Sequence, residues 1–338
     1  MKDIRLQINL KSACNLRCSY CALSERSKND YKEDTSVLIG NAHKLVAKCL
    51  DEGYNIVYFV LFGGEPTIVE ADLVAKIFNI IHETFPGARR GIQTNGTLVT
   101  KDYIDLMIDT LDTTEHFTIG FSIDACKSMQ DKYRSNSYDL AMENMTRIHR
   151  EGIIPVFAVP TIGPQHEHVI PEMNEWVAFM RKEGMGIYLS YIGGDYGIPD
   201  PNFYKWFTNW IIDQDLIHSA VKLFGMNWCY RNDCNKMLLD LSDGDIFQCE
   251  NTFVKESPIS NWLDKSLEEV YADRQCHVDA VPTHPDCDTC EYQPFCNKGC
   301  PLYRINGLPS DCEAIKRVFG YLTSRGVDWR EYIGFYDR

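Results

Sequence analysis

Along the first two-thirds of the chain, segments in which apolar residues recur every second position alternate with segments in which they recur with the period of a helix. Segments with a two-residue period, or with continuous β-branched and aromatic residues, predict strands at residues 4–9, 55–62, 91–94, 117–123, 153–161 and 185–192. Segments with a helical period predict helices at residues 36–51, 69–84, 101–111, 138–151 and 166–182. Strands that lead into helices through short connections predict an α/β fold with a parallel sheet, either doubly wound or curled into a barrel. Functional side chains are then expected on loops at the carboxyl ends of the strands.

The pattern changes after residue 193, where glycines and prolines mark a boundary loop. An aromatic-rich helix is predicted at 202–224, a β-hairpin at 236–241 and 246–249 around Asp243-Gly244, and a last helix at 313–325. We therefore expect a barrel domain at 1–195, a helical linker at 196–228, a small cysteine-rich, hairpin-containing domain at 229–316, and a C-terminal helix and tail at 317–338.

Charge and hydropathy narrow the range of partners. The 338 residues include 34 Lys and Arg against 48 Asp and Glu, which gives a net charge of −14. Such a chain has no global positive field to attract nucleic acid or an anionic membrane, and we expect neither as a partner. The first 15 residues contain no signal-peptide core, and the longest apolar run, 56–62, is too short to cross a bilayer. We therefore expect a cytoplasmic protein.

The chain contains 14 cysteines. In a reducing compartment this number indicates metal or redox chemistry rather than disulfides. Cys14, Cys18 and Cys21 follow the first predicted strand with the spacing C-x3-C-x2-C. Structural zinc sites and [4Fe–4S] clusters usually take four ligands, so three thiolates leave one metal position open to a substrate or cofactor. Three separate buried thiols, or a zinc site completed by a remote residue, are the alternatives.

The triad, with aromatic Tyr20 directly before its third cysteine, resembles the signature of the radical S-adenosylmethionine (SAM) superfamily. The resemblance covers roughly residues 4–192 and implies a partial (β/α)6 barrel. It also implies that Cys14, Cys18 and Cys21 hold a [4Fe–4S] cluster whose open iron chelates SAM. One electron then cleaves SAM to a 5′-deoxyadenosyl radical, which abstracts a hydrogen atom from an unactivated C–H bond.

Further strand-end motifs resemble those with which this superfamily holds SAM. Gly63-Gly64-Glu65-Pro66 follows the second strand and resembles the motif that binds the SAM amino group; its glycines allow close backbone approach, and Glu65 offers an acceptor. Gln93-Thr94-Asn95-Gly96 ends the third strand. Ser122 and Asp124 end the fourth, where the family contacts the ribose hydroxyls and the carboxylate, and Arg134 resembles the arginine that binds the SAM carboxylate. The implied cofactor-binding residues are Tyr20, Gly63, Gly64, Glu65, Pro66, Asn95, Ser122, Asp124 and Arg134. Taken singly, each is also compatible with an ordinary turn or surface position.

The downstream cysteines resemble the SPASM extension of the same superfamily, with one additional cysteine upstream. That resemblance assigns auxiliary cluster I to Cys229, Cys234, Cys249 and Cys300. It assigns auxiliary cluster II to Cys287, Cys290, Cys296 and Cys312. Three [4Fe–4S] clusters are thus expected in all. If Cys229 is not a ligand, cluster I keeps an open or non-cysteine site, and one or two structural zinc ribbons are the rival interpretation.

Glu250 directly follows Cys249. In sulfatase-maturing members, which this extension resembles, a carboxylate at this place takes the proton as the substrate radical is oxidised. Glu250 is therefore the candidate catalytic base, with an exposed glutamate at a hairpin end as the alternative. Of the remaining cysteines, Cys49 is expected in the core, and Cys126 and Cys276 have no assigned partner.

The leading hypothesis is a radical SAM/SPASM enzyme that abstracts hydrogen from a peptide or protein side chain and leads to oxidation or cross-link formation, as in the maturation of ribosomal peptides. The second is oxidation or epimerisation of a small molecule such as a sugar or aminocyclitol. The third is a zinc-stabilised adaptor. Flavodoxin or ferredoxin is the expected reductant. No winged leader-binding module precedes the first strand, so we expect a leader peptide to need either a separate binding protein or a different surface.

Overall fold

The computed structural model describes residues 1–10, 13–21, 35–191, 201–219, 236–247, 258–279, 282–296, 298–299 and 304–327. The chain forms two compact units, each assembled from several segments. The first unit comprises Met1–Ile123, Lys127–Ala158 and Asn235–Gln275. The second comprises Asp124–Cys126, Val159–Cys234 and Cys276–Arg338.

A parallel sheet forms the first unit. Its strands β1 (Lys2–Asn9), β2 (Tyr54–Phe62), β3 (Arg89–Thr94), β4 (Phe117–Phe121) and β5 (Val156–Ala158) pair in chain order. On the other side of β1 the sheet is extended by β9 (Lys236–Asp240), which is parallel to β1. Next come β10 (Asp245–Phe247), which is antiparallel to β9, and β11 (Ser260–Asn261), which is antiparallel to β10. The predicted parallel α/β sheet is confirmed, and the predicted hairpin is part of it.

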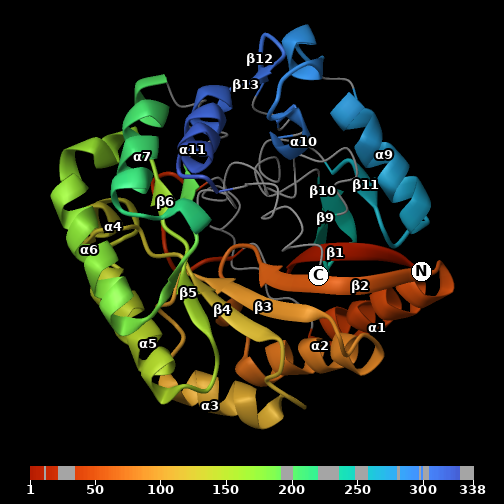
Figure 1. Cartoon of the computed structure of the whole chain (residues 1–338). Coiled ribbons are helices and arrows are strands. Elements are labelled where there is room, and N and C mark those ends of the chain that lie inside the picture. Colours follow the sequence, from red (N-terminus) through yellow and green to blue (C-terminus); the bar gives the residue numbers. More distant parts are fainter. Residues whose placement is uncertain are drawn as a thin grey trace. The chain divides into compact units, whose positions relative to one another are not determined.

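Three helices cover one face of this sheet, as Figure 1 shows: α1 (Thr35–Asp51), α2 (Ala71–Thr84) and α3 (Lys101–Thr110). The unit also contains α4 (Lys127–Tyr133) and α5 (Tyr138–Glu151). The core between helices and sheet includes Phe78 of α2, whose ring lies 5.3 Å from that of Phe59 and 4.8 Å from that of Phe117. All three rings are buried. Truncating a phenylalanine in such a position to alanine costs about 3–5 kcal/mol.

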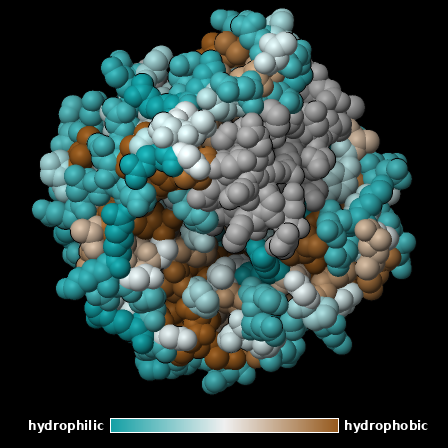
Figure 2. Space-filling model, in the orientation of Figure 1, coloured by the Kyte–Doolittle hydropathy of each residue, from teal (hydrophilic) through white to brown (hydrophobic). Residues whose placement is uncertain are grey.

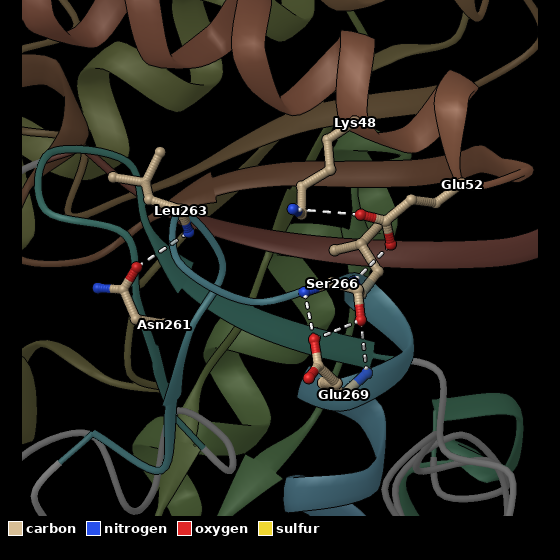
Figure 3. Close-up of polar contacts among 7 residues, drawn as sticks. Lys48, Glu52, Asn261, Leu263, Ser266 and Glu269 are labelled. Atoms are coloured by element: carbon tan, nitrogen blue, oxygen red, sulfur yellow. Dashed lines mark hydrogen bonds and ion pairs between the residues drawn. The ribbon is translucent and has the colours of Figure 1, made fainter.

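The end of α1 is joined to the start of α9 (Leu267–Asp279) by the contacts drawn in Figure 3. The Glu52 carboxylate accepts a 2.5 Å hydrogen bond from the Leu267 amide. Ser266 and Glu269 form a reciprocal cap: the Glu269 carboxylate accepts from the Ser266 amide at 2.9 Å, and the Ser266 hydroxyl accepts from the Glu269 amide at 3.2 Å. This arrangement satisfies amide donors that the first turn of a helix leaves without partners.

The second unit contains α6 (Ile170–Glu183), α7 (Pro201–Asp213), α10 (Gln293–Cys296) and α11 (Cys312–Ser324). Its short strands are β6 (Thr161–Ile162), β7 (Gly186–Ile187), β8 (Ser190–Tyr191), β12 (Arg304–Ile305) and β13 (Leu308–Pro309). β6 pairs in parallel with β8, and β12 pairs antiparallel with β13. Helices α7 and α11 are in contact, and Arg317 donates a 2.9 Å hydrogen bond to Asn209.

Several predicted elements are shorter or divided in the structure. The strand expected at 185–192 is divided into β7 and β8. The strand expected at 153–161 is divided into β5 and β6, because Pro155 and Pro160 have no amide proton for a strand ladder. The helix expected at 202–224 ends at Asp213. There Asp215 adopts a left-handed conformation (φ 47°) and the Leu216 amide bonds back to the Ile211 carbonyl, which is a Schellman termination.

The described surface is mainly polar. Figure 2 shows hydrophilic residues over most of the coloured face. The large exposed apolar side chains are distributed over several elements, among them Leu50 on α1, Leu106 on α3 and Leu140 on α5. Single exposed apolar residues of this kind are normal for a folded protein. Among the described helices, none is long and apolar enough to cross a membrane.

Candidate functional site

The cysteine triad lies on a loop after the carboxyl end of β1. Cys18 is buried, while Cys14 and Cys21 are half-buried. The Cys14 sulfur accepts two hydrogen bonds, from the Leu16 amide at 3.4 Å and from the Asn95 side-chain amide at 3.8 Å. Burial raises the pKa of the Cys14 thiol, and these two donors lower it because they favour the thiolate. The pKa is raised on balance, so the two donors offset only part of the cost of placing a negative charge on this buried sulfur.

The Gly63-Gly64-Glu65-Pro66 motif forms the turn after β2. Gly63 has φ 136°, a conformation that side chains strongly disfavour. Glu65 then caps a 3-10 helix, Pro66–Ile68, and its carboxylate accepts from the Thr67 amide at 3.0 Å and the Thr67 hydroxyl at 2.5 Å. A proline in the first position suits this helix because the missing amide has no partner there anyway.

Glu65 also joins this turn to two other segments. Its Oε1 accepts from the Thr94 hydroxyl at 2.6 Å, and its Oε2 accepts from the Asn95 amide at 2.6 Å. Its own amide donates to the Ala13 carbonyl at 2.8 Å. Complete burial raises the pKa of Glu65, and the hydrogen bonds to the carboxylate oppose that shift. The cysteine loop, the β2 turn and the end of β3 thus meet at one edge of the sheet, where the sequence predicted them.

Arg134 follows α4 and lies beside the cysteine loop. Its guanidinium carbon is 5.1 Å from the centre of the Tyr20 ring, which is a cation–π geometry. The loop is held to the same segment by a 2.9 Å hydrogen bond from the Ser19 amide to the Tyr133 carbonyl. A buried cation is therefore placed next to the triad.

The other two predicted SAM residues have partners within the protein. The Ser122 amide donates to the Thr94 carbonyl at 2.8 Å, and its hydroxyl accepts from the Gln93 side chain at 2.8 Å. Asp124, which belongs to the second unit, is fully buried and accepts from the Thr161 amide at 3.1 Å. Ser122 thus belongs to the same strand-end network as Glu65. Asp124 instead bonds to a residue of the second unit, to which it belongs.

Four of the downstream cysteines lie in the second unit. Cys287 and Cys296 are buried, while Cys290 and Cys312 are half-buried. Burial raises the pKa of Cys296 to about 11, and Cys312 and Cys290 add to the shift through charge repulsion. Charge repulsion from Cys290 and Cys287 also raises the pKa of Cys312, after burial itself. These four thiols therefore lie within electrostatic range of one another, and their assignment to one auxiliary cluster stays a prediction.

The remaining predicted ligands and the candidate base lie outside the described residues; they are Cys229, Cys234, Cys249, Cys300 and Glu250. Of the three remaining cysteines, Cys49 and Cys126 are buried. Burial is what the sequence predicted for Cys49. The aromatic residues Phe207 and Trp210 of α7 are also buried, so they belong to the core of the second unit.

The two cysteine groups fit iron–sulfur clusters by the type of their side chains, not by a close grouping of those side chains among the described residues. All described cysteines are free thiols, and thiolates are the usual ligands of such clusters. Hydrogen-bond donors reach the Cys14 sulfur, which suits a charged ligand. Within the described part of the chain, no three His, Cys, Asp or Glu side chains are grouped closely enough to hold a metal ion.

Comparison with known proteins identifies the family. Residues 8–177 match the radical SAM superfamily, and the chain belongs to it. Membership implies a [4Fe–4S] cluster and SAM as cofactors. The resemblance that the cysteine triad indicated is thereby confirmed.

Two relatives match over nearly their whole length. A cysteine-type anaerobic sulfatase-maturating enzyme of Clostridium novyi (strain NT) is 22% identical, with 94% of this chain and 95% of the relative aligned. A protein of the same description from Clostridium perfringens (strain 13 / Type A) is 19% identical over the same shares. The similarity therefore extends through the cysteine-rich half.

Solved structures share the fold. Native anSMEcpe with bound AdoMet (SAM) superposes with a TM-score of 0.73 at 18% identity and covers 95% of this chain and 97% of that one. Streptococcus suis SuiB bound to precursor peptide SuiA gives a TM-score of 0.66 at 16% identity, with 92% and 74% covered. The predicted fold of a radical SAM barrel followed by a SPASM domain is confirmed.

Several residues of the site were not found from the sequence. Asn15, Thr67 and Thr97 connect the predicted site residues to one another. Thr67 and Thr97 lie just beyond the motifs that resemble the family's, and Asn15 lies inside the cysteine signature. Their position next to a strand-end motif was the available signal, since such loops carry function in this architecture.

Proposed function

We propose that this chain is a radical SAM enzyme that modifies a side chain of a peptide or protein, in the manner of a sulfatase maturase. The observation that carries the proposal is the meeting of the cysteine loop with Glu65, Asn95 and Arg134 at one edge of the sheet. The full-length similarity to two sulfatase-maturating enzymes supports the substrate class. The solved structures of anSMEcpe with bound Cp18Cys peptide and of SuiB with its precursor peptide support it too.

The chain's own residues would divide the work as follows. Cys14, Cys18 and Cys21 hold the cluster, which supplies an electron to bound SAM and thereby the hydrogen-abstracting radical. Arg134 neutralises the SAM carboxylate through a charge-assisted contact. The Gly63-Gly64 backbone and Ser122 bind the rest of SAM.

The downstream cysteines would hold two auxiliary clusters, in the two sets that the SPASM pattern implies. Their proposed role is to accept the second electron when the substrate radical is oxidised. Glu250 would take the accompanying proton, which requires it to lie within hydrogen-bond reach of the substrate. The removal of a hydrogen atom, an electron and a proton then amounts to a two-electron oxidation, as in formylglycine formation. Cross-link formation would use the same first step but would bond the carbon radical to a second side chain, which would lose a proton, with the remaining electron passing to an auxiliary cluster.

We place the enzyme in the cytoplasm, with flavodoxin or ferredoxin as the electron donor. A separate leader-binding protein would be needed only for a leader-dependent peptide substrate. Oxidation or epimerisation of a sugar or aminocyclitol is the second candidate on the sequence alone. Membership of an enzyme superfamily argues against the zinc-stabilised adaptor.

The test is incubation of the anaerobically reconstituted protein with SAM, a chemical reductant and synthetic peptides. The peptides carry a cysteine or serine within a sulfatase-type sequence, and matched peptides carry alanine at that position. We expect 5′-deoxyadenosine together with a mass change on the cysteine or serine peptide alone.

A change in a sugar or aminocyclitol, with unaltered peptides, would replace the peptide proposal by the small-molecule one. A colourless, zinc-loaded protein that leaves SAM intact would refute the enzyme assignment, because thiolate-bound clusters absorb visible light.

A further inference from the structure

The side chain of Asn95 uses all of its hydrogen-bonding capacity within the protein. Its amide nitrogen donates to the Asn15 side-chain oxygen at 2.9 Å and to the Cys14 sulfur at 3.8 Å. Its amide oxygen accepts from the Thr97 amide at 2.9 Å and the Thr97 hydroxyl at 2.6 Å. An asparagine side chain has two N–H donors and one oxygen with two lone pairs. All four are therefore in use, and Asn95 is buried.

The backbone of Asn95 is fixed as firmly as its side chain. Its amide donates to the buried Glu65 carboxylate at 2.6 Å. The amide of the same Glu65 holds the Ala13 carbonyl at 2.8 Å, directly before Cys14. Glu65 therefore sets the distance between the segment that carries Asn95 and the segment that carries Cys14.

We infer that Asn95 is a positioning residue for Cys14 rather than a ligand of SAM. This inference rests on the proposed function, in which Cys14 binds the cluster with the open iron. Asn95 orients the Cys14 side chain and donates a hydrogen bond to its sulfur, next to the donor from the Leu16 amide at 3.4 Å. From the family resemblance Asn95 was expected to contact SAM. Because its side-chain amide already makes all of its hydrogen bonds within the protein, we assign it to the positioning of Cys14 instead.

The physical consequence is a shift in reduction potential. A reduced cluster carries one more negative charge than an oxidised one. Hydrogen bonds to the ligand sulfurs stabilise that charge and raise the potential. Removal of the Asn95 donor lowers the potential of the triad cluster. Because no hydrogen-bonding group of the Asn95 side chain is left for SAM, the same change leaves SAM affinity nearly unaltered.

The test uses the full-length, anaerobically reconstituted protein and two substitutions. Asn95→Asp keeps the size and shape of the side chain but replaces the donor nitrogen by an oxygen. Asn95→Ala removes the whole amide and serves if the carboxylate is not tolerated. The matched control is Asn79→Ala, which removes a half-buried asparagine side chain of α2 that donates to the Thr110 carbonyl at 2.8 Å and bonds to no residue of the cysteine loop in the contacts described. Iron content and circular dichroism verify that each variant is folded and loaded.

Two quantities are measured: SAM affinity by equilibrium binding, and the midpoint potential of the cluster whose electron paramagnetic resonance spectrum changes when SAM is added. We expect both Asn95 variants to lower the midpoint potential, Asn95→Asp by more, and Asn79→Ala to leave it unchanged. SAM affinity should stay within about threefold of wild type in all three.

An unchanged potential in both Asn95 variants overturns the inference. SAM binding that is weakened more than about tenfold, with an unchanged potential, shows instead that Asn95 is a SAM ligand. A wild-type protein without any SAM-responsive cluster refutes the proposed function itself, so the two failures are distinguishable.

Discussion

Asn9 donates a 2.6 Å hydrogen bond from its side-chain amide to the carboxylate of Asp240, which lies 231 residues further along the chain. Both side chains are buried at the carboxyl ends of their strands, β1 and β9, whose last residues are paired. The other carboxylate oxygen of Asp240 accepts from the Ser242 amide at 2.9 Å and its hydroxyl at 2.5 Å. The polar pair therefore fixes the strand that follows the barrel to the first strand of the barrel.

Replacement of Asp240 by alanine should destabilise the first unit. The change leaves the buried amide of Asn9 without this acceptor and also removes the acceptor of two Ser242 donors. A lost buried partner costs about 1–3 kcal/mol, so we expect a loss of about 2–4 kcal/mol in the free energy of unfolding, measured by urea denaturation. The control Asp243→Ala alters an exposed carboxylate in the same turn and should change stability by less than about 0.5 kcal/mol. Equal effects of the two substitutions would contradict this account.

Simultaneous replacement of Cys14, Cys18 and Cys21 by alanine should abolish SAM cleavage. Without the three thiolates no cluster with an open iron can form, whereas the downstream cysteines keep their iron. Chromatography of 5′-deoxyadenosine and an iron assay measure the two effects. The control Cys49→Ala alters a buried thiol of α1 and should preserve cleavage. Continued 5′-deoxyadenosine production by the triple variant would contradict the assignment of the triad.

Arg134→Gln should weaken SAM binding. A hydrogen bond to a charged group contributes about 1.5–3 kcal/mol, which corresponds to an increase in Kd of about tenfold or more. Lys132→Gln removes a charge two residues earlier, on α4, where the Lys132 ammonium lies 5.1 Å from the centre of the Tyr133 ring. This variant should leave the affinity within about twofold. Equilibrium dialysis with SAM distinguishes the two variants. Equal affinities would show that Arg134 does not bind the cofactor.

Glu250→Gln should separate SAM cleavage from product formation. The glutamine cannot take a proton, so the substrate radical forms but its oxidation is impaired. The measured quantity is the ratio of modified peptide to 5′-deoxyadenosine, which should fall in this variant. Glu313→Gln, an exposed change next to Cys312, is the control and should keep the wild-type ratio. A normal ratio in Glu250→Gln would exclude Glu250 as the base.

Because of His166, the free energy of unfolding should decrease in mild acid. Burial in the second unit lowers the pKa of His166 below its usual 6.5, although Asp124 and the Gly163 backbone oppose the shift. Below about pH 6.5 the unfolded chain therefore binds a proton that the folded chain does not, and stability falls as the pH decreases towards the folded-state pKa. His166→Gln removes this contribution and should flatten the loss of melting temperature between about pH 7.5 and 5.5. The exposed His168→Gln is the control and should retain the wild-type slope.

The first strands and helices could be predicted closely because their patterns are strong and local. The predicted ends of β1 to β4, α1 to α3 and α5 differ from the structure by at most two residues. Helix α9 was missed because its sequence has little apolar periodicity, although the Ser266-x-x-Glu269 capping pattern was present. Helix α4 has 7 residues and is too short for a periodic signal. The addition of β9 to β1 could not be predicted, because no local pattern records a partner 231 residues away.

In the candidate site, too, local motifs could be predicted from the sequence and contacts between distant residues could not. The spacing of Cys14, Cys18 and Cys21 and the Gly63-Gly64-Glu65-Pro66 motif can be read within a few residues of sequence. The bond between Asn95 and Cys14 joins residues 81 positions apart. Such a contact depends on the packing of strand ends, and a motif search that assigns each residue a role separately cannot find it.

The pairing of the first strand with β9 has a consequence for biosynthesis. Ribosomes add about 5–20 residues per second, so roughly 10–50 s pass between the emergence of β1 and that of β9. Throughout this interval one border of the nascent β1 exposes backbone groups that can pair with another growing polypeptide. Dense polysomes should therefore favour entanglement of neighbouring nascent molecules, and chaperone capture of the amino-terminal segment should increase the yield of correctly folded protein.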